Sequence, residues 1–282
     1  MCFPALTGQT LHLFKNLKMK SKLIVTVFAI FLISMSCGNN DQFPVTDLHI
    51  HLKGDFGIED AVRKSEAEKI NYGIVINCGL KFPVHKDSQI DSALLTLKDY
   101  PQFFIGMQAE GREWVDLFSK ESVEKFDYVF TDAMTFTDEK GRRNRIWIKE
   151  ETFIDDEEAF MDHLVATIVK ILSEEPIDIY VNPTFLPAQM ADRYDSFWTE
   201  KRMDKVIRAA KENNVAIEIN NRYKIPSYEF LKRAKSEGVK FTVGTNNTDS
   251  AFSGAEYALD MIKRLKLTRD DFFEPVNKRK NG

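Results

Sequence analysis

Two patterns of hydrophobic and polar positions alternate along the chain from about residue 45 onward. Short runs rich in β-branched and aromatic residues end in polar side chains, and longer runs with apolar residues three or four positions apart separate them. The first pattern is typical of buried strands and the second of amphipathic helices. The expected strands cover residues 45–51, 72–78, 103–110, 128–136, 178–184, 216–221 and 240–246.

The regular alternation of strands and helices predicts a parallel sheet with helices outside it. In a closed βα barrel the functional groups gather at the carboxyl ends of the strands, whereas an open doubly wound sheet gathers ligands at one crevice. All seven expected strands end in polar residues, which favours the closed barrel. No linker-like stretch divides residues 43–282, so we expect one α/β domain there, a distorted TIM-like (β/α)7 barrel.

The first 36 residues have the composition of an export signal. Lysines between Lys15 and Lys22 precede an apolar run at 23–33, which ends in S-M-S-C at Cys37. S-M-S-C resembles a bacterial lipobox, which implies cleavage before Cys37 and lipidation of its thiol. An ordinary signal with an incidental cysteine is the alternative. Met19 is a second candidate start, because M-K-S-K-L-I-V makes a complete signal by itself.

Residues 37–42 look like a polar tether that links the anchor to the barrel. We therefore expect an exported bacterial lipoprotein in the periplasm or cell envelope, attached to the membrane only through its lipid. Removal of the signal takes away four lysines and no acidic residue, which leaves 35 basic against 43 acidic residues, a net charge of −8. An acidic surface argues against nucleic acid as the main partner. Cys78 is then the remaining thiol, so no internal disulfide is expected.

Histidines stand close together at the end of the first expected strand. In T-D-L-H-I-H, the residues Asp47, His49 and His51 occupy alternate positions, so a regular strand points all three side chains to one face. This arrangement raises the question of whether the two imidazoles form one wall of a metal site.

D-L-H-I-H after the first strand, seven βα units and G-T-N-N-T-D at the last strand resemble the PHP family (polymerase and histidinol phosphatase) over most of residues 43–267. The resemblance implies a distorted seven-stranded barrel that binds two or three Zn, Mn or Fe ions and hydrolyses phosphoesters. His49 and His51 match the family's first pair of ligands, and Glu110 matches its bridging glutamate. Other residues stand where further ligands are usual: Asn77, Cys78, Met134, Asn182, Asn246 and Thr248.

The remaining donors suggest a reduced site for one divalent metal. By strand alternation Asp132 shares the face of Met134, and with His49, His51 and Glu110 it makes a set of two histidines and two carboxylates, which suits Zn²⁺, Mn²⁺ or Fe²⁺.

The alternative is a polar core in which the same groups hydrogen-bond one another without metal. The asparagines favour this alternative, because an amide is a poor metal ligand but a good partner for sugar hydroxyls or carboxylates. Cys78 is either a zinc ligand or a small buried group.

Further polar groups at the strand ends are candidates for substrate binding. Arg112 and Arg222 are expected to hold a substrate anion, although a salt bridge to a neighbouring acid is equally consistent with Arg112. The segment 138–145 reads as a charged hairpin turn around a glycine. The full set of expected substrate-binding residues is Arg112, Glu113, Asn182, Asn220, Arg222 and Asn246.

Two functions follow from the sequence. The first is a metal-dependent hydrolase of a phosphoester or similar small anionic or sugar-like molecule, in which the metal activates water. Asp132 and Glu218 are the candidate catalytic bases, if burial raises their pKa values. The second is a non-catalytic ligand-binding or interaction protein that uses the same barrel without metal.

Overall fold

The computed structural model describes residues 45–252 and 254–279, and all of these belong to one compact unit. The expected signal at 1–36, the tether at 37–42 and the lipidation site Cys37 lie outside the described residues. Within the described part, no helix has the length and apolar character that crossing a membrane requires.

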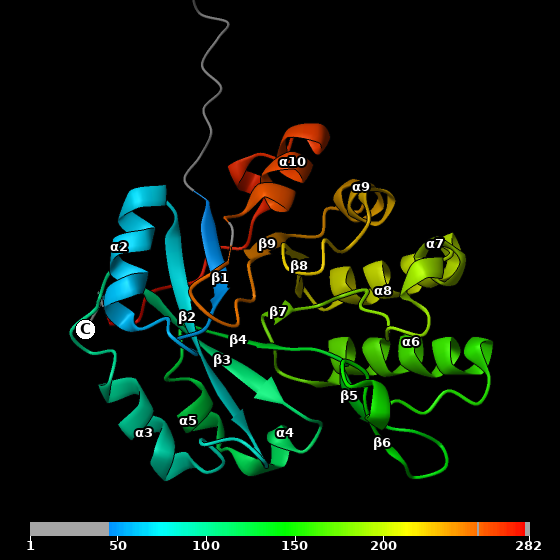
Figure 1. Ribbon diagram of the computed structural model, residues 1–282, viewed down its shortest axis with the longest axis horizontal. Helices are drawn as coiled ribbons and strands as arrows, with labels where there is room; N and C mark the ends of the chain where they lie inside the picture. Colours follow the sequence, from blue (N-terminus) through cyan, green and yellow to red (C-terminus); the bar gives the residue numbers. More distant parts are fainter. Residues whose placement is uncertain (1–44, 253, 280–282) are drawn as a thin grey trace, which may run out of the picture. The chain divides into compact units, whose positions relative to one another are not determined.

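Seven parallel strands close into a barrel, which confirms the expected fold class (Figure 1). Each strand pairs in parallel with the next around the barrel, and β1 pairs with β9 to close it. In order around the barrel the strands are β1 (Thr46–Ile50), β2 (Asn71–Gly79), β3 (Phe104–Glu110), β4 (Tyr128–Thr131), β7 (Ile179–Tyr180), β8 (Ala216–Asn220) and β9 (Phe241–Gly244).

Helices surround the strands and turn their apolar faces toward them (Figure 1). Side chains cap several helices at the amino end; Asp156, for example, accepts from the backbone N–H of Ala159 at 2.8 Å. The helices are α2 (Ile58–Glu68), α3 (Asp87–Leu95), α4 (Trp114–Leu117), α5 (Lys120–Val123), α6 (Glu157–Glu174), α7 (Tyr194–Phe197), α8 (Glu200–Glu212), α9 (Tyr228–Ser236) and α10 (Glu256–Leu265). Short 3-10 turns are η1 (Lys149–Glu151), η2 (Ala191–Arg193) and η3 (Arg269–Asp271).

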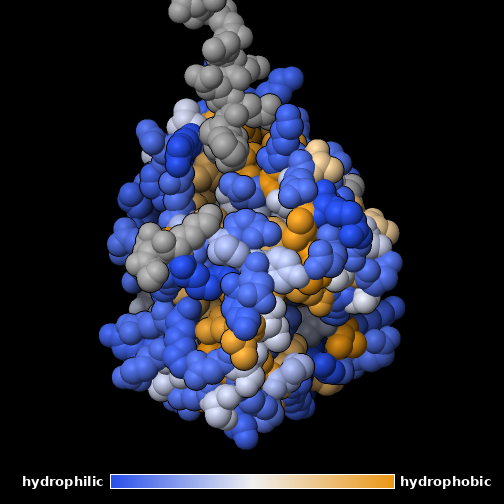
Figure 2. Space-filling model, turned by 90° about the vertical axis from the view of Figure 1, so that its left-hand side faces the viewer, coloured by the Kyte–Doolittle hydropathy of each residue, from blue (hydrophilic) through white to orange (hydrophobic). Residues whose placement is uncertain are grey.

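The surface between these helices is mostly hydrophilic. Figure 2 shows one face, on which polar residues predominate and apolar residues form small, separated areas. Scattered apolar residues of this kind are usual on folded proteins.

The expected strand at 128–136 is two strands rather than one. β4 ends at Thr131, and the carboxylate of Asp132 accepts from the backbone N–H of Met134 at 2.9 Å, a local bond that turns the chain out of the barrel. β5 (Thr135–Thr137) then pairs antiparallel with β6 (Arg143–Arg145). The segment 138–145 thus forms the charged hairpin that its sequence predicts.

Apolar side chains fill the barrel interior below the polar strand ends. The Tyr128 hydroxyl donates to the backbone oxygen of Leu48 at 2.7 Å and so crosses the interior. Gly73 and Gly106 leave room for its ring, because a Cβ at either position would overlap Tyr128. The interior cluster consists of Leu48, Val75, Tyr128, Phe130, Ile179, Val181 and Ala216. The polar groups of the candidate site lie beyond this apolar cluster, at the carboxyl ends of the strands.

The first strand departs from the regular alternation expected of it. Its register against β2 shifts after Asp47, as in a β-bulge. Leu48 packs in the apolar interior, and the next residue, His49, contacts the Phe130 ring with the ring centroids 4.6 Å apart. The Asp47 carboxylate instead accepts from the backbone N–H groups of His49 at 3.0 Å and Thr245 at 3.2 Å. Asp47 thus joins β1 to the end of β9 and does not share a face with the histidines.

Candidate functional site

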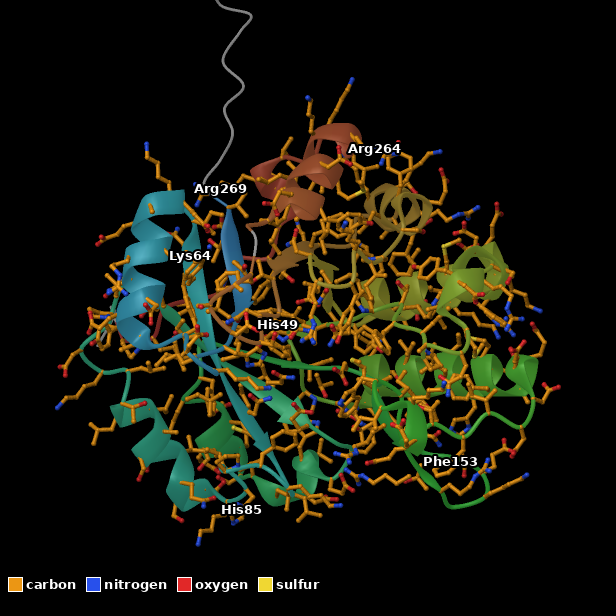
Figure 3. The ribbon with its side chains drawn as sticks, in the orientation of Figure 1. His49, Lys64, His85, Phe153, Arg264 and Arg269 are labelled. Carbon is orange, nitrogen blue, oxygen red and sulfur yellow. The ribbon has the colours of Figure 1, made fainter. Side chains whose placement is uncertain are left out.

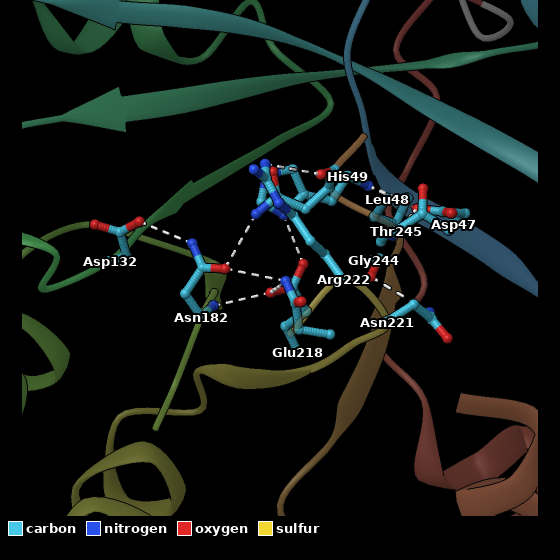
Figure 4. Close-up of polar contacts among 12 residues, drawn as sticks. Asp47, Leu48, His49, Asp132, Asn182, Glu218, Asn221, Arg222, Gly244 and Thr245 are labelled. Atoms are coloured by element: carbon cyan, nitrogen blue, oxygen red, sulfur yellow. Dashed lines mark hydrogen bonds and ion pairs between the residues drawn. The ribbon is translucent and has the colours of Figure 1, made fainter. Parts of the chain in front are cut away.

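A buried histidine held by a buried glutamate lies at the centre of the candidate site (Figure 4). Nδ1 of His49 lies 2.6 Å from Oε1 of Glu218, and both side chains are 1% exposed. Gly244 on β9 makes this contact possible, because a Cβ there would overlap the Glu218 carboxylate. With Nδ1–H donating to Glu218, the other ring nitrogen carries a lone pair.

That second nitrogen, Nε2 of His49, is buried and has no hydrogen-bond partner among the described residues. The ring of His51 lies beside it, with centroids 5.1 Å apart. Burial, followed by the electrostatic effects of His49, Lys53 and Arg222, holds the pKa of His51 well below its usual range. His51 is therefore neutral at physiological pH. Figure 3 shows His49 inside the ribbon and His85 at its periphery.

Two carboxyl groups lie near the histidines at the ends of β3 and β4. Burial, and then the charge of Asp132, raise the pKa of Glu110 to about 7. Burial also raises the pKa of Asp132. Asn77 donates to Glu110 at 2.8 Å, and Asn182 donates to Asp132 at 2.9 Å. Because the two carboxyl groups repel each other when both are charged, one proton near neutral pH is favoured between them.

Asn182 connects the two halves of this site. Its backbone N–H donates to Oε2 of Glu218 at 2.8 Å, while its side-chain amide donates to Asp132. Its Oδ1 accepts from Asn220 at 3.0 Å and from Asn246 at 3.2 Å. The structure therefore brings together the three asparagines expected from the sequence, but their amides hydrogen-bond mainly to one another and to the carboxylates.

The loop after β3 places two more of the expected residues outside the central group. Arg112 donates to Oε1 of Glu175 at 2.6 Å and to the backbone oxygen of Asp132 at 2.8 Å, so the salt-bridge alternative describes it. Glu113 forms an ion pair with Arg143 of β6 and ties the loop to the hairpin. Both side chains thus form ion pairs at the rim of the barrel.

Cys78 has the properties of a small buried group. Its side chain is buried, and its Sγ lies 3.4 Å from the backbone oxygen of Ile76. Burial, with a smaller effect from the charge of Glu110, raises the pKa of the thiol to about 12. The thiol therefore stays protonated and is a poor metal ligand.

Sequence reasoning missed two residues that shape the site. Asn247 accepts from the backbone N–H of His51 at 2.7 Å and donates to the His51 carbonyl at 2.9 Å, which fixes the end of β1. Tyr223 lies in the turn after β8, close enough to Asp132 and Glu218 for their charges to affect its pKa. The only feature of the sequence that could have pointed to Asn247 is the run of asparagines in G-T-N-N. The alternation of side chains along the strand did not point to Tyr223, which follows the strand.

The divalent metal expected from the sequence would need several side chains arranged around one point. In residues 45–252 and 254–279, no three His, Cys, Asp or Glu side chains are arranged to hold a metal ion. Glu110 and Asp132 each accept a hydrogen bond from an asparagine, and Nε2 of His49 is buried without a hydrogen-bond partner among the described residues. This arrangement does not fit a divalent metal bound by His49, His51, Glu110 and Asp132.

No family model and no curated protein matches the chain. Among solved structures, histidinol phosphate phosphatase from Lactococcus lactis, in complex with zinc, L-histidinol and phosphate, has a similar fold. The TM-score is 0.54 at 14% identity, over 79% of this chain and 94% of the other. Two weaker matches are a chain of archaeal ribonuclease P with mature tRNA (TM-score 0.38, 13% identity, 79% and 88% covered) and HpcH/HpaI aldolase from Desulfitobacterium hafniense (0.38, 12%, 82% and 95%).

The first of these likenesses defines the class of fold. The chain is an α/β protein with a closed barrel of seven parallel strands and surrounding helices, like that phosphatase. At 14% identity the likeness concerns the fold, and the chemistry has to be argued from the side chains described above.

The raised pKa values of Asp47, about 6, and of Glu110, about 7, predict how stability depends on pH. Each folded-state pKa exceeds its ordinary value, so the stabilisation from protonation is complete below about pH 4 and is lost as the pH rises through 6 and 7. From pH 5 to pH 8 we expect the raised pKa of Glu110 to lower the free energy of unfolding by about 2–3 kcal/mol, whereas the lowered pKa of His51 raises it over the same range and offsets part of the fall. Urea titrations at both pH values measure it.

In Glu110→Gln the contribution of Glu110 to the pH dependence of the free energy of unfolding should disappear. A matched change at an exposed position, Glu121→Gln, should leave the pH dependence of the parent unchanged. If the free energy of unfolding changed equally with pH in the parent and in Glu110→Gln, the assignment of a raised pKa to Glu110 would be contradicted.

A second prediction concerns metal content. Because no three His, Cys, Asp or Glu side chains of residues 45–252 and 254–279 are arranged to hold a metal ion, and both carboxyl groups accept hydrogen bonds from amides, the purified protein should retain well below one metal ion per chain after incubation with Zn²⁺, Mn²⁺ or Fe²⁺. Elemental analysis measures this, with the His49→Ala/His51→Ala double variant as control. One metal ion per chain in the parent, lost in the double variant, would show that the side chains rearrange around a metal.

Proposed function

We propose that this protein is a hydrolase on a PHP-type barrel that acts on a small anionic molecule at the carboxyl ends of the strands. The observation that carries the proposal is the unpaired Nε2 of His49, which is oriented by Glu218. Glu110 and Asp132, at the ends of the paired strands β3 and β4, are buried carboxyl groups with raised pKa values at the same end of the barrel. Nε2 is thus the proposed proton acceptor, and this pair of carboxyl groups is the proposed proton donor.

His49 is the proposed general base. A carboxylate that accepts from Nδ1–H fixes the imidazole orientation and leaves Nε2 to take a proton from water. Glu218 is held in place for this role, because its second oxygen accepts from the Asn182 backbone N–H at 2.8 Å and from the Asn220 amide at 2.9 Å. Glu218 therefore acts through His49 as a positioning residue, which replaces its sequence-based role as a base.

Glu110 and Asp132 are the proposed source of the leaving-group proton. A carboxyl group with a pKa of about 7 is partly protonated at neutral pH, where it can serve as a general acid. In the reaction, water attacks the ester and loses a proton to His49, while the bond to the leaving oxygen breaks and that oxygen takes the proton of Glu110. Protonation of the pair also weakens its repulsion of an anionic substrate.

The likeness to a phosphatase complexed with L-histidinol and phosphate supports a phosphoester as the first substrate class to test. The lipoprotein-type leader supports a location in the periplasm or cell envelope, with the membrane anchor at Cys37.

A non-catalytic binding protein is the second candidate. It is favoured by the burial of Nε2 of His49, which has almost no exposed surface, and by the mutual hydrogen bonds of Asn182, Asn220 and Asn246. A satisfied polar group of this kind can bind a ligand without reacting with it.

Hydrolysis of a panel of chromogenic phosphomonoesters and carboxyl esters tests the first candidate. We expect turnover by the parent, and a drop in kcat of about 10²–10⁴-fold with little change in KM for His49→Gln and Glu218→Gln. His163→Gln on α6 is the control and should keep the parent's kcat. Full activity in His49→Gln would rule out His49 as the base. Ligand binding by the parent without any turnover would support the second candidate.

A further inference from the structure

The turn after β8 presents Arg222 and Tyr223 at the carboxyl end of the barrel in a fixed geometry. Asn220 and Ile225 close the turn: the Asn220 N–H donates to the Ile225 oxygen at 2.7 Å, and the Ile225 N–H donates back at 3.2 Å. Inside the turn, Oδ1 of Asn220 accepts from the backbone N–H of Tyr223 at 2.9 Å. Asn220 also bonds to Glu218, so the turn is tied directly to the central group.

The ring of Tyr223 is held between two neighbours. The Phe185 ring packs against it with centroids 4.8 Å apart and planes 68° apart, and the Arg222 guanidinium lies 5.1 Å from its centroid. The ring is partly buried, and no hydrogen bond joins its hydroxyl to another residue of the described part of the chain. A fixed ring with a free hydroxyl is suited to contact a ligand.

Arg222 also has unused bonding capacity. It is exposed, and its one hydrogen bond is a long one, 3.4 Å from Nη1 to the Asn246 backbone oxygen. Within residues 45–252 and 254–279, most arginines form an ion pair with a carboxylate, and Arg222 and Arg208 do not. Figure 4 shows Arg222 extending from its turn toward the group that contains His49, Asn182 and Glu218.

We propose that Tyr223 is a substrate-contacting residue, and that its hydroxyl and the Arg222 guanidinium together bind an anionic oxygen group of the substrate. A guanidinium offers two parallel N–H donors that match a carboxylate or phosphate, and a neutral phenol adds one further donor. The substrate class is then a small molecule that carries a phosphate or carboxylate group.

This inference deepens the proposed function, because the subsite holds the anionic group beside His49. The binding itself needs no reaction, so it can be measured separately. Burial raises the pKa of Tyr223, which keeps the phenol protonated and able to donate.

The test is calorimetric titration of the purified full chain with inorganic phosphate and, separately, with acetate. We expect Arg222→Gln to weaken binding of the preferred anion by about tenfold or more, and Tyr223→Phe by about three- to tenfold. Tyr223→Phe keeps the ring between Phe185 and Arg222, so the fold should be retained, and an unchanged urea unfolding curve verifies this.

Two matched controls are available elsewhere in the chain. Tyr228 also lies under an arginine, with Arg264 4.3 Å from its centroid, and Arg208 is the other arginine without a carboxylate partner. Tyr228→Phe and Arg208→Gln should bind both anions as the parent does. Tighter binding of phosphate assigns the subsite to a phosphate group, and tighter binding of acetate assigns it to a carboxylate.

Failure of the parent to bind either anion, or equal binding by the parent and both Arg222→Gln and Tyr223→Phe, would overturn the inference. If these variants lose binding while no ester is hydrolysed, the subsite stands and only the proposed reaction fails. If hydrolysis depends on His49 but anion binding is unchanged in both variants, the reaction stands and the subsite fails.

Discussion

The hydrogen bond between Nδ1 of His49 and the Glu218 carboxylate is the interaction on which the rest of the site depends. Both groups are almost fully buried, and a buried carboxylate is costly unless its oxygens are bonded. Asn182 and Asn220 bond the second oxygen, and Gly244 leaves the space for the pair. The same bond that stabilises Glu218 leaves Nε2 of His49 as an unpaired acceptor. The contact that satisfies the Glu218 carboxylate therefore also leaves Nε2 of His49 able to accept a proton.

Amide side chains explain how several carboxyl groups share one barrel opening. Asn77 and Asn182 donate to Glu110 and Asp132, so each carboxyl group has a neutral partner in place of a cation. Burial, and then the charge of Asp132, raise the pKa of Glu110 to about 7, and burial also raises the pKa of Asp132. The asparagines therefore give the carboxyl end of the barrel a network of hydrogen bonds that includes both carboxyl groups.

The barrel and its polar rim could be predicted from the sequence, because strand period and strand-end polarity are local signals. The pairing of side chains could not. Arg112 pairs with Glu175, which lies 63 residues further along the chain, and Asp47, beside the irregularity in β1, accepts from the backbone N–H of Thr245, which follows β9. The alternation of side chains holds only within a strand. Asp132 lies just beyond the end of β4, although the sequence pattern placed it inside a longer strand, and Tyr223 lies in a turn, where alternation predicts no orientation.

The protonation of His49 is the most direct test of this account. Long-range ¹⁵N–¹H correlation spectra of ¹⁵N-labelled protein, with the His49→Gln variant used to assign the signals, distinguish the two neutral tautomers. The account predicts a proton on Nδ1, donated to Glu218, and an unprotonated Nε2. A spectrum that places the proton on Nε2 would contradict the account, because no acceptor for a proton from water would then face the carboxyl groups.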